Sequence, residues 1–307
     1  MSRLNILNTI GLIIALVSGT ACAGSDPVID VFILAGQSNM VGGAQAEKLD
    51  ETLQPFVQPN SNVTTRTWLN GEDYGDGWEP LQPRGRSKSY GPEMMAGYVL
   101  SDVHQDRNLA FMKIAYNGTN LGCAWHPSGC GQNLYAKMAS LVDDWKEELE
   151  DQGWSVRFAG FIWVQGEGDC TADWSANSYG KNLQLLIDGV RDFTGNGDLA
   201  VVVAKVAPRG SGYPYVNTVH QGIETVSTQD AKLAAVTCEA IELKDDQVHF
   251  SSHGMIMLGS ALADTLLALD PFELSQEVPV CQSDINGDGD VNVIDILLMI
   301  SNFGPCP

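Results

Sequence analysis

The sequence predicts an α/β fold in which a mostly parallel sheet is covered by helices on both faces. Short apolar runs rich in Val, Ile and Phe indicate buried strands, and amphipathic segments of helical period lie between them. Strands that alternate with helices form parallel sheets, in which ligands bind beyond the carboxyl ends of the strands. The chain has 307 residues and is 44% hydrophobic, which is enough to bury a large core.

The first 23 residues have the pattern of a secretory signal peptide. Arg3 precedes an apolar run, and small residues lead up to a cleavage position after Ala23. Because the run is too short for a membrane span, we expect a secreted protein. Lipoprotein anchoring at Cys22 is the alternative, and it is less expected because Gly19 stands where a larger aliphatic residue is usual.

The main domain is expected to span residues 24–270. Its strands are predicted at residues 28–35, 109–116, 156–164, 199–206 and 232–237. Helices are predicted at residues 133–151, around residues 183–190 and at residues 255–269, where apolar positions recur every three or four residues. Residues 50–90 are rich in Gly, Pro, Asn and Trp without a clear period, so we expect an irregular insertion that shapes a binding site.

Charge and cysteine content limit the partners and the compartment. The formal net charge of -21 disfavours nucleic acid as a partner. Beyond the signal peptide, the cysteines are expected to be oxidised in a secreted protein. Closeness in sequence favours two disulfides, and elimination gives a third: Cys123 with Cys130, Cys281 with Cys306, and Cys170 with Cys238.

A serine lies where the first predicted strand ends, in the stretch Gly36-Gln37-Ser38-Asn39-Met40. In such a sharp turn a serine hydroxyl can project from the carboxyl edge of the sheet, with backbone N–H groups free to bind an oxyanion. Taken alone, a serine in a glycine turn is more often a helix N-cap. The nucleophile hypothesis therefore depends on the other loops at this edge.

A histidine lies in the loop between the last predicted strand and the last predicted helix. His249 follows Asp246 by three residues. The carboxylate can hold one ring nitrogen while the other faces a serine hydroxyl, which fixes the tautomer for general base catalysis. We expect this loop at the same sheet edge as Ser38, which favours a catalytic role over that of an ordinary surface histidine.

Two further loops at the predicted edge carry groups that acyl transfer needs. Gln165 can donate an amide N–H to a developing oxyanion, and Glu167 or Asp169 nearby can orient a base. Gly118 offers a backbone N–H in the loop after the strand at residues 109–116. Four loops with such residues at one edge together favour a serine esterase.

These motifs resemble those of the SGNH hydrolase superfamily, and within it the acetylesterases of carbohydrate esterase family 6 and the sialate O-acetylesterase-like proteins. The matching stretches are Gly36-Gln37-Ser38-Asn39-Met40, Asn117-Gly118-Thr119-Asn120-Leu121, residues 163–169, and Asp246-Gln247-Val248-His249-Phe250 with Gly254. The resemblance implies a three-layer, flavodoxin-like parallel sheet. It also implies a serine esterase that removes O-acetyl groups from carbohydrate through an acetyl-serine intermediate, with no cofactor for catalysis.

The resemblance also implies a role for each site residue. Ser38 is the expected nucleophile, His249 the general base and acid, and Asp246 the partner of His249, with Glu167 as the alternative acid of the triad. The implied oxyanion hole consists of the N–H of Ser38, the N–H of Gly118 and the side chain of Gln165. The wider superfamily has asparagine in this third block, so the glutamine is a departure from its pattern.

Residues 281–307 are predicted to form a separate module after a linker at residues 271–280. Oxygen-bearing side chains at calcium-loop spacing surround a central glycine. The expected calcium ligands are Asp284, Asn286, Asp288, Asp290, Asn292 and Asp295. The pattern resembles a dockerin repeat, but a complete dockerin has two repeats and this chain shows one, which leaves a cohesin-like or cell-surface partner open.

The expected substrate is an acetylated polysaccharide such as acetylated xylan, with O-acetylated sialate as the alternative. Dockerin-like modules accompany polysaccharide degradation, which favours the polysaccharide. Another class of function is a non-catalytic carbohydrate-binding protein on the same scaffold, and the intact set of nucleophile, base and carboxylate argues against it. Four loop residues are candidates either for lining a sugar site or for packing: Arg84, Tyr90, Trp125 and His126.

Overall fold

The computed structural model describes residues 26–84 and 88–272. Several sequence predictions lie outside these residues. They are the signal peptide with Cys22, most of the linker at residues 271–280, the calcium loop, and the pairing of Cys281 with Cys306. Within the described residues, no helix is long and apolar enough to cross a membrane.

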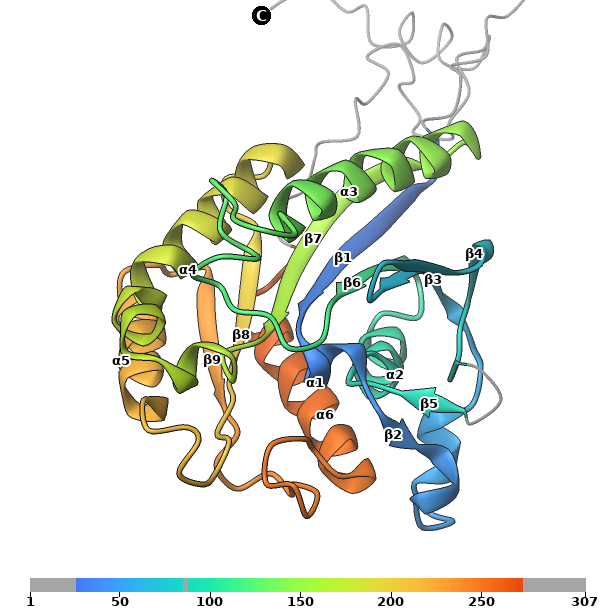
Figure 1. The fold of residues 1–307 in the computed structure, drawn as a ribbon. Helices are drawn as coiled ribbons and strands as arrows, with labels where there is room; N and C mark the ends of the chain where they lie inside the picture. Colours follow the sequence, from blue (N-terminus) through green and yellow to red (C-terminus); the bar gives the residue numbers. More distant parts are fainter. Residues whose placement is uncertain (1–25, 85–87, 273–307) are drawn as a thin grey trace, which may run out of the picture. The chain divides into compact units, whose positions relative to one another are not determined.

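A mixed sheet forms the centre of the described residues (Figure 1). Its seven strands are β1 (Val28–Gly36), β3 (Asn60–Leu69), β4 (Glu72–Leu81), β6 (Asn108–Ala115), β7 (Ser155–Val164), β8 (Ala200–Lys205) and β9 (Leu233–Thr237). The strand order is β4-β3-β6-β1-β7-β8-β9, and only the edge strand β4 runs antiparallel to its neighbour. The predicted α/β fold and all five predicted strands are confirmed.

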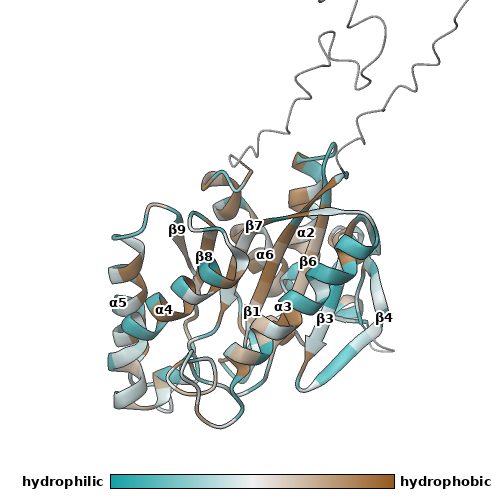
Figure 2. Ribbon diagram, turned by 90° about the horizontal axis from the view of Figure 1, so that it is seen from above, coloured by the Kyte–Doolittle hydropathy of each residue, from teal (hydrophilic) through white to brown (hydrophobic). Residues whose placement is uncertain are grey.

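Helices cover both faces of this sheet (Figure 2). On one face lie α2 (Glu93–Val103) and α6 (Ser252–Ala268), and on the other lie α3 (Leu134–Asp151), α4 (Asp173–Thr194) and α5 (Val216–Ser227). Side chains alternate along β1, so Phe32 and Leu34 join the core under α2 and α6, while Val31 and Ile33 join the opposite core. The three layers follow from this alternation.

The predicted helix at residues 133–151 illustrates how the pattern determines the packing. Its apolar side chains are buried at helical spacing, and the side chain of Asn133 caps the first turn by accepting a hydrogen bond from the N–H of Ala136. Each large apolar side chain that is fully buried contributes about 1.5–3 kcal/mol to the stability of the fold. The other two predicted helices are confirmed as α4 and α6, whereas α2 and α5 were not predicted.

The prediction of an irregular insertion at residues 50–90 is wrong in part. Strands β3 and β4 form a hairpin within it, and β3 continues the main sheet beside β6. The turn consists of Asn70 and Gly71, both with positive φ (53° and 98°), as a tight two-residue hairpin requires. The same stretch also holds a short 3₁₀ segment, Gln54–Val57, and β5 (Ser89–Tyr90), which pairs with β2 (Ala44–Gln45).

Candidate active site

The loops expected to carry the site meet at one edge of the sheet because three neighbouring strands end at the same register position. Gly36 at the end of β1 is in register with Ala115 of β6 and with Val164 of β7. Gly36 has a φ of 150°, and a Cβ there would lie 2.0 Å from the carbonyl oxygen of Val164. Only glycine fits this approach, which sets the start of the short helix α1 (Ser38–Val41) directly beside the end of β7.

Three of the predicted residues form a hydrogen-bonded chain. His249 Nε2 lies 3.0 Å from Ser38 Oγ, and His249 Nδ1 lies 2.8 Å from Asp246 Oδ2. The other carboxylate oxygen of Asp246 accepts hydrogen bonds at 2.9 Å from the backbone N–H groups of Val248 and His249. The carboxylate thus orients the ring and also holds the turn that carries it.

Asp246 is held as an anion. Burial acts to raise its pKa, but hydrogen bonds from the backbone and ring of His249 and from the N–H of Val248 outweigh this and lower the pKa to about 2. Its side chain is 48% exposed, so its interaction with the imidazole is partly screened by solvent. The negative charge remains available to a protonated histidine over the whole neutral range.

A pocket of about 660 Å³ opens in front of this chain of side chains. Its lining residues are Gln37, Ser38, Asn117, Gly118, Asn120, Glu167, Gly168, Thr171, Tyr213, Val248 and His249. The N–H groups of Ser38 and Gly118 donate to no acceptor among the described residues. Both are therefore free to bind the oxyanion of a tetrahedral intermediate, as expected from the sequence.

The expectation that Gln165 supplies a third oxyanion donor is not met. Its side chain is fully buried and does not line the pocket. The side-chain Nε2 donates instead to Gln37 Oε1 at 3.1 Å, to the carbonyl oxygen of Thr119 at 3.1 Å and to Asp169 Oδ2 at 2.7 Å. Because these three acceptors take the hydrogen bonds of the amide, Gln165 holds together the residues beneath the pocket.

Glu167, the alternative acid of the triad, makes no hydrogen bond with the histidine ring. Its Oε1 accepts a hydrogen bond from Asn39 Nδ2, and Asn39 also bonds to the carbonyl oxygen of Val248 and the N–H of Phe250. Asn39, to which the sequence analysis gave no role, therefore ties the residue after the nucleophile to the loop of His249. The geometry favours Asp246 as the partner of the histidine.

Glu167 is 2% exposed, and its Oε2 has no hydrogen-bond partner among the described residues. Burial raises the pKa of Glu167 to about 7, and the nearby Asp169 also raises it. The hydrogen bonds from the backbone N–H of Glu167 and from Asn39, together with the charge of His249, lower this pKa and limit the rise. A carboxyl group in this environment favours its protonated form below neutral pH. The free energy of unfolding should therefore depend on pH through the protonation of Glu167.

We expect Glu167→Gln to change how stability depends on pH. The folded carboxyl keeps its proton up to about pH 7, whereas the unfolded one loses it near 4.5, so its contribution to the free energy of unfolding falls between those values. Relative to wild type, the variant should therefore gain up to roughly 3 kcal/mol between pH 4 and pH 8. Urea unfolding across this range measures the difference, with the exposed Glu72→Gln as the control; a constant difference for both variants would contradict the buried-carboxyl interpretation.

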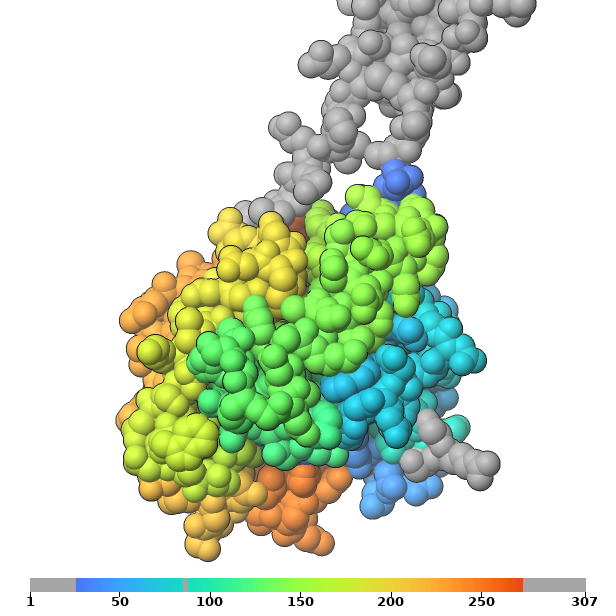
Figure 3. All heavy atoms as spheres, turned by 45° about the horizontal axis from the view of Figure 1, so that its top comes forward, coloured from blue at the N-terminus to red at the C-terminus, as the bar shows by residue number. Residues whose placement is uncertain are grey.

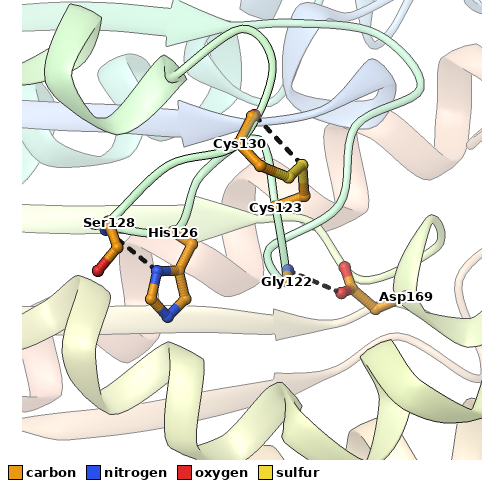
Figure 4. Close-up of a disulfide and its surroundings, with 6 residues drawn as sticks. All are labelled: Gly122, Cys123, His126, Ser128, Cys130 and Asp169. Carbon is orange, nitrogen blue, oxygen red and sulfur yellow. Dashed lines mark hydrogen bonds between the residues drawn. A yellow bond between two sulfur atoms is a disulfide. The ribbon is translucent and has the colours of Figure 1, made fainter.

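Asp169 braces the loop that follows β6. It accepts a hydrogen bond from the N–H of Leu121 at 2.9 Å. It accepts another from the N–H of Gly122 at 3.2 Å (Figure 4). Burial raises the pKa of Asp169 to about 6, and these hydrogen bonds together with that from Gln165 limit the rise. In Figure 3 the green loop after β6 lies against the yellow-green start of α4. Asp169 thus fixes one wall of the pocket and does not orient the base.

The same loop is closed by a disulfide between Cys123 and Cys130, whose Cα atoms are 4.9 Å apart (Figure 4). This pairing agrees with the one expected from closeness in sequence. The pairing of Cys170 with Cys238 is wrong, because both are free and buried. Cys170 packs in the core under α3, α4 and α5 and Cys238 in the core under α2 and α6, so the sheet separates them.

A buried ion pair lies below the other end of α1. Lys113 Nζ lies 2.5 Å from Glu93 Oε2, and both side chains are almost completely buried. Lys113 and Arg84 both donate to the carbonyl oxygen of Val41, the last residue of α1. Burial acts to raise the pKa of Glu93, but the charges of Lys113 and Arg84 lower it overall, so the carboxylate stays ionised beside its two cations.

Lys113→Met is expected to destabilise the protein strongly. The variant leaves the buried carboxylate of Glu93 without its nearest cation, which typically costs about 3–5 kcal/mol in the free energy of unfolding. The double variant Lys113→Met with Glu93→Gln removes the uncompensated charge and should recover part of that loss. Urea unfolding measures both. A loss below about 1 kcal/mol in the single variant would show that the pair does not hold this part of the fold.

The four candidates for lining a sugar site pack or bond elsewhere. The fully buried Tyr90 donates to the carbonyl oxygen of Ser252, and the fully buried Trp125 donates to Thr119 Oγ1. Arg84 bonds to Val41, as described above, and His126 Nδ1 accepts from the N–H of Ser128. None of the four lines the pocket. The sequence analysis gave no role to the pocket residues Asn120 and Thr171, which lie in or next to motif loops, and it missed Tyr213, which lies in the loop between β8 and α5.

Within residues 26–84 and 88–272, no three or more His, Cys, Asp or Glu side chains are grouped so that they could hold a metal ion. The calcium ligands expected at residues 284–295 lie beyond this range.

Residues 28–268 match the model of a protein family described as carbohydrate esterase, sialic acid-specific acetylesterase. Among curated proteins, a probable carbohydrate esterase of Arabidopsis thaliana is 26% identical over 255 residues, covering 79% of this chain and 92% of that protein. The family match includes every site residue described above.

Solved structures share the fold. The crystal structure of the same Arabidopsis thaliana protein aligns with a TM-score of 0.62 and 22% identity, covering 79% of this chain and 99% of that one. A carbohydrate acetylesterase from Xanthomonas citri aligns with a TM-score of 0.58 and 16% identity, covering 76% of this chain and 55% of that one. NanS aligns with a TM-score of 0.58 and 11% identity, covering 80% and 98%.

Proposed function

The chain belongs to the sialic acid-specific acetylesterase family of carbohydrate esterases, and we propose that it removes O-acetyl groups from a carbohydrate with Ser38 as nucleophile. The observation that supports this role is the hydrogen-bonded chain from Ser38 through His249 to Asp246. It opens on a pocket of about 660 Å³ where two backbone N–H groups are free. Nucleophile, base and oxyanion donors are thus within reach of one bound ester.

In the first half of the proposed reaction, Ser38 Oγ attacks the acetyl carbonyl carbon while its proton passes to His249 Nε2. Asp246 stabilises the imidazolium, and the N–H groups of Ser38 and Gly118 stabilise the oxyanion. The C–O bond to the sugar then breaks, and the proton on His249 goes to the leaving sugar oxygen. The products of this half are the free sugar hydroxyl and an acetyl ester on Ser38.

In the second half, His249 removes a proton from water, and the resulting hydroxide equivalent attacks the acetyl carbonyl on Ser38. The second tetrahedral intermediate forms in the same oxyanion site. It collapses to acetate while the proton on His249 returns to Ser38 Oγ. The enzyme regains its starting state, and one water has been consumed for each acetate released.

A neutral acetylated glycan, such as acetylated xylan, is the proposed substrate class. Sialic acid carries a carboxylate, and proteins commonly bind carboxylates with arginine or lysine. Among the described residues that line the pocket, none is arginine or lysine, and Glu167 adds an acidic group. The formal net charge of -21 also disfavours an anionic sugar. O-Acetylated sialate is therefore the second candidate.

Acetate release from purified wild-type protein tests the proposal. The substrates are 4-nitrophenyl acetate, acetylated xylan and 9-O-acetylated sialic acid. Acetate from acetylated xylan at a higher kcat/KM than from the sialic acid supports a neutral glycan, and the reverse order favours sialate. If no substrate releases acetate while the protein still binds glycans, the carbohydrate-binding alternative replaces the esterase.

Secretion through residues 1–23 and calcium binding by residues 281–307 are proposed from the sequence alone, since both segments lie outside the described part of the chain. The lipoprotein alternative at Cys22 and a cohesin-like or cell-surface partner for residues 281–307 are likewise proposed from the sequence alone. A calcium titration of the full mature chain, with Asp284→Ala as the control variant, measures the metal site directly.

A further inference from the structure

A tryptophan beside the pocket is unusually exposed. Trp174, the second residue of α4, is 57% exposed, although most large apolar side chains of the described residues are buried. Tryptophan is mostly buried in folded proteins and is enriched at binding sites when it is not. The exposure of Trp174 therefore indicates a role in binding.

The exposed ring is held in place by the backbone of the neighbouring loop. A Cβ built on Gly122 would lie 2.7 Å from ring atom Cζ3 of Trp174 and 3.2 Å from Cη2, so the ring edge rests directly on the glycine. Gly122 is fixed from below by its hydrogen bond to Asp169, and the next residue, Cys123, is in the disulfide (Figure 4). The exposed ring edge therefore rests on an anchored loop, and a pre-organised surface lowers the entropic cost of binding a ligand.

Two short paths connect this ring to the pocket. Asn120 lines the pocket two residues before Gly122, and Thr171 lines it three residues before Trp174. At about 3.8 Å per residue, the Cα atom of Gly122 lies within about 8 Å of that of Asn120, and the Cα atom of Trp174 lies within about 11 Å of that of Thr171. A glycan whose acetylated unit occupies the pocket can therefore reach the indole with a neighbouring sugar unit.

We propose that Trp174 is a stacking platform for a sugar unit next to the acetylated one, so that the enzyme prefers oligosaccharides to monosaccharides. This rests on the proposed esterase function. The C–H groups on one face of a pyranose ring are apolar and pack on an indole surface. The residue before Trp174 is the acidic Asp173, and among the described residues that line the pocket none is arginine or lysine, which suits a neutral sugar unit.

Kinetics on substrates of increasing length test the platform. Trp174→Ala should lower kcat/KM for acetylated xylo-oligosaccharides about tenfold or more, mainly through KM, because truncating a tryptophan in a binding site commonly has an effect of this size. Activity on 4-nitrophenyl acetate and acetylated xylose should stay within about twofold, since neither reaches the ring. Trp174→Phe keeps an aromatic surface and should retain most of the preference for long substrates.

Two further variants separate stacking from general damage. Gly122→Ala places a methyl group against the ring and should displace Trp174 without removing it, so it should lower the same oligosaccharide activity. Tyr98→Ala removes an aromatic side chain that is 39% exposed on α2, across the sheet, and should leave all activities unchanged. A matching loss in Trp174→Ala and Gly122→Ala supports the platform.

Other outcomes overturn the proposal. If wild type hydrolyses acetylated xylose as well as it hydrolyses the longer oligosaccharides, no platform exists and the esterase function stands. If Trp174→Ala lowers activity on 4-nitrophenyl acetate as much as on oligosaccharides, the residue acts in folding of the site. If wild type hydrolyses none of these esters, the proposed esterase function itself fails. This result is distinct from an active esterase that shows no preference for long substrates, which overturns only the platform.

Discussion

Replacing Ser38 by alanine is expected to lower kcat for acetate release by about 10⁴- to 10⁶-fold, the range found when the nucleophile of a serine hydrolase is removed. No other hydroxyl is hydrogen-bonded to His249 in the structure, among the described residues. Without Oγ no acetyl-enzyme can form, and the remaining rate comes from substrate binding and the oxyanion donors alone. Initial rates on 4-nitrophenyl acetate and on acetylated xylan measure the loss.

The matched control for this variant is Ser61→Ala, which removes an exposed hydroxyl at the start of β3, at the end of the sheet opposite the triad. It should keep wild-type rates on both substrates. Far-ultraviolet circular dichroism and urea unfolding should be unchanged for Ser38→Ala, because the hydroxyl is only partly buried and supports no other contact. A folded Ser38→Ala protein that keeps more than about a tenth of the rate would contradict the assignment.

Asp246→Asn is expected to have the second-largest effect, a loss in kcat of about 10⁴-fold, the size seen for the same change in a serine protease triad. Asp246 Oδ2 accepts from His249 Nδ1, which leaves Nε2 free to take the proton of Ser38. An asparagine that presents its NH₂ group there favours the opposite tautomer and removes the charge that stabilises the imidazolium. The loss should appear in kcat more than in KM.

Glu167→Gln provides the comparison that separates the two candidate acids of the triad. Glu167 accepts a hydrogen bond from Asn39 and makes none with the ring of His249, and glutamine keeps an oxygen for Asn39. We therefore expect less than about a tenfold loss in kcat. A large loss in Glu167→Gln with a small loss in Asp246→Asn would restore Glu167 as the partner of the histidine.

The fold was largely predictable because its central strands are buried on both faces. Strands such as β1, with eight consecutive buried residues, leave an uninterrupted apolar run in the sequence. The hairpin of β3 and β4 was missed because β4 is mostly exposed and carries Gly75 and Gly77 within it. The adjacent residues Asn70 and Gly71 were the signal that could have revealed it.

The site was predictable where the topology alone brings residues together. Ser38 follows β1 directly, and His249 follows the last strand, so both belong to the edge where parallel strands end. The direction in which a side chain points could not be predicted from the topology. Gln165 points away from the pocket because its amide donates to three buried acceptors. The pairing of Cys170 with Cys238 failed because elimination ignores which face of the sheet each thiol joins.

The measurement that tests the central claim most directly is the site of labelling by a serine-directed fluorophosphonate. Wild-type protein is treated until activity on 4-nitrophenyl acetate is lost, and the modified peptide is identified by mass spectrometry. We predict one phosphonyl group per chain, on Ser38, in proportion to the activity lost, and no labelling of Ser38→Ala. Complete inactivation with the label on another residue, or full activity with Ser38 labelled, would contradict the claim that Ser38 is the nucleophile.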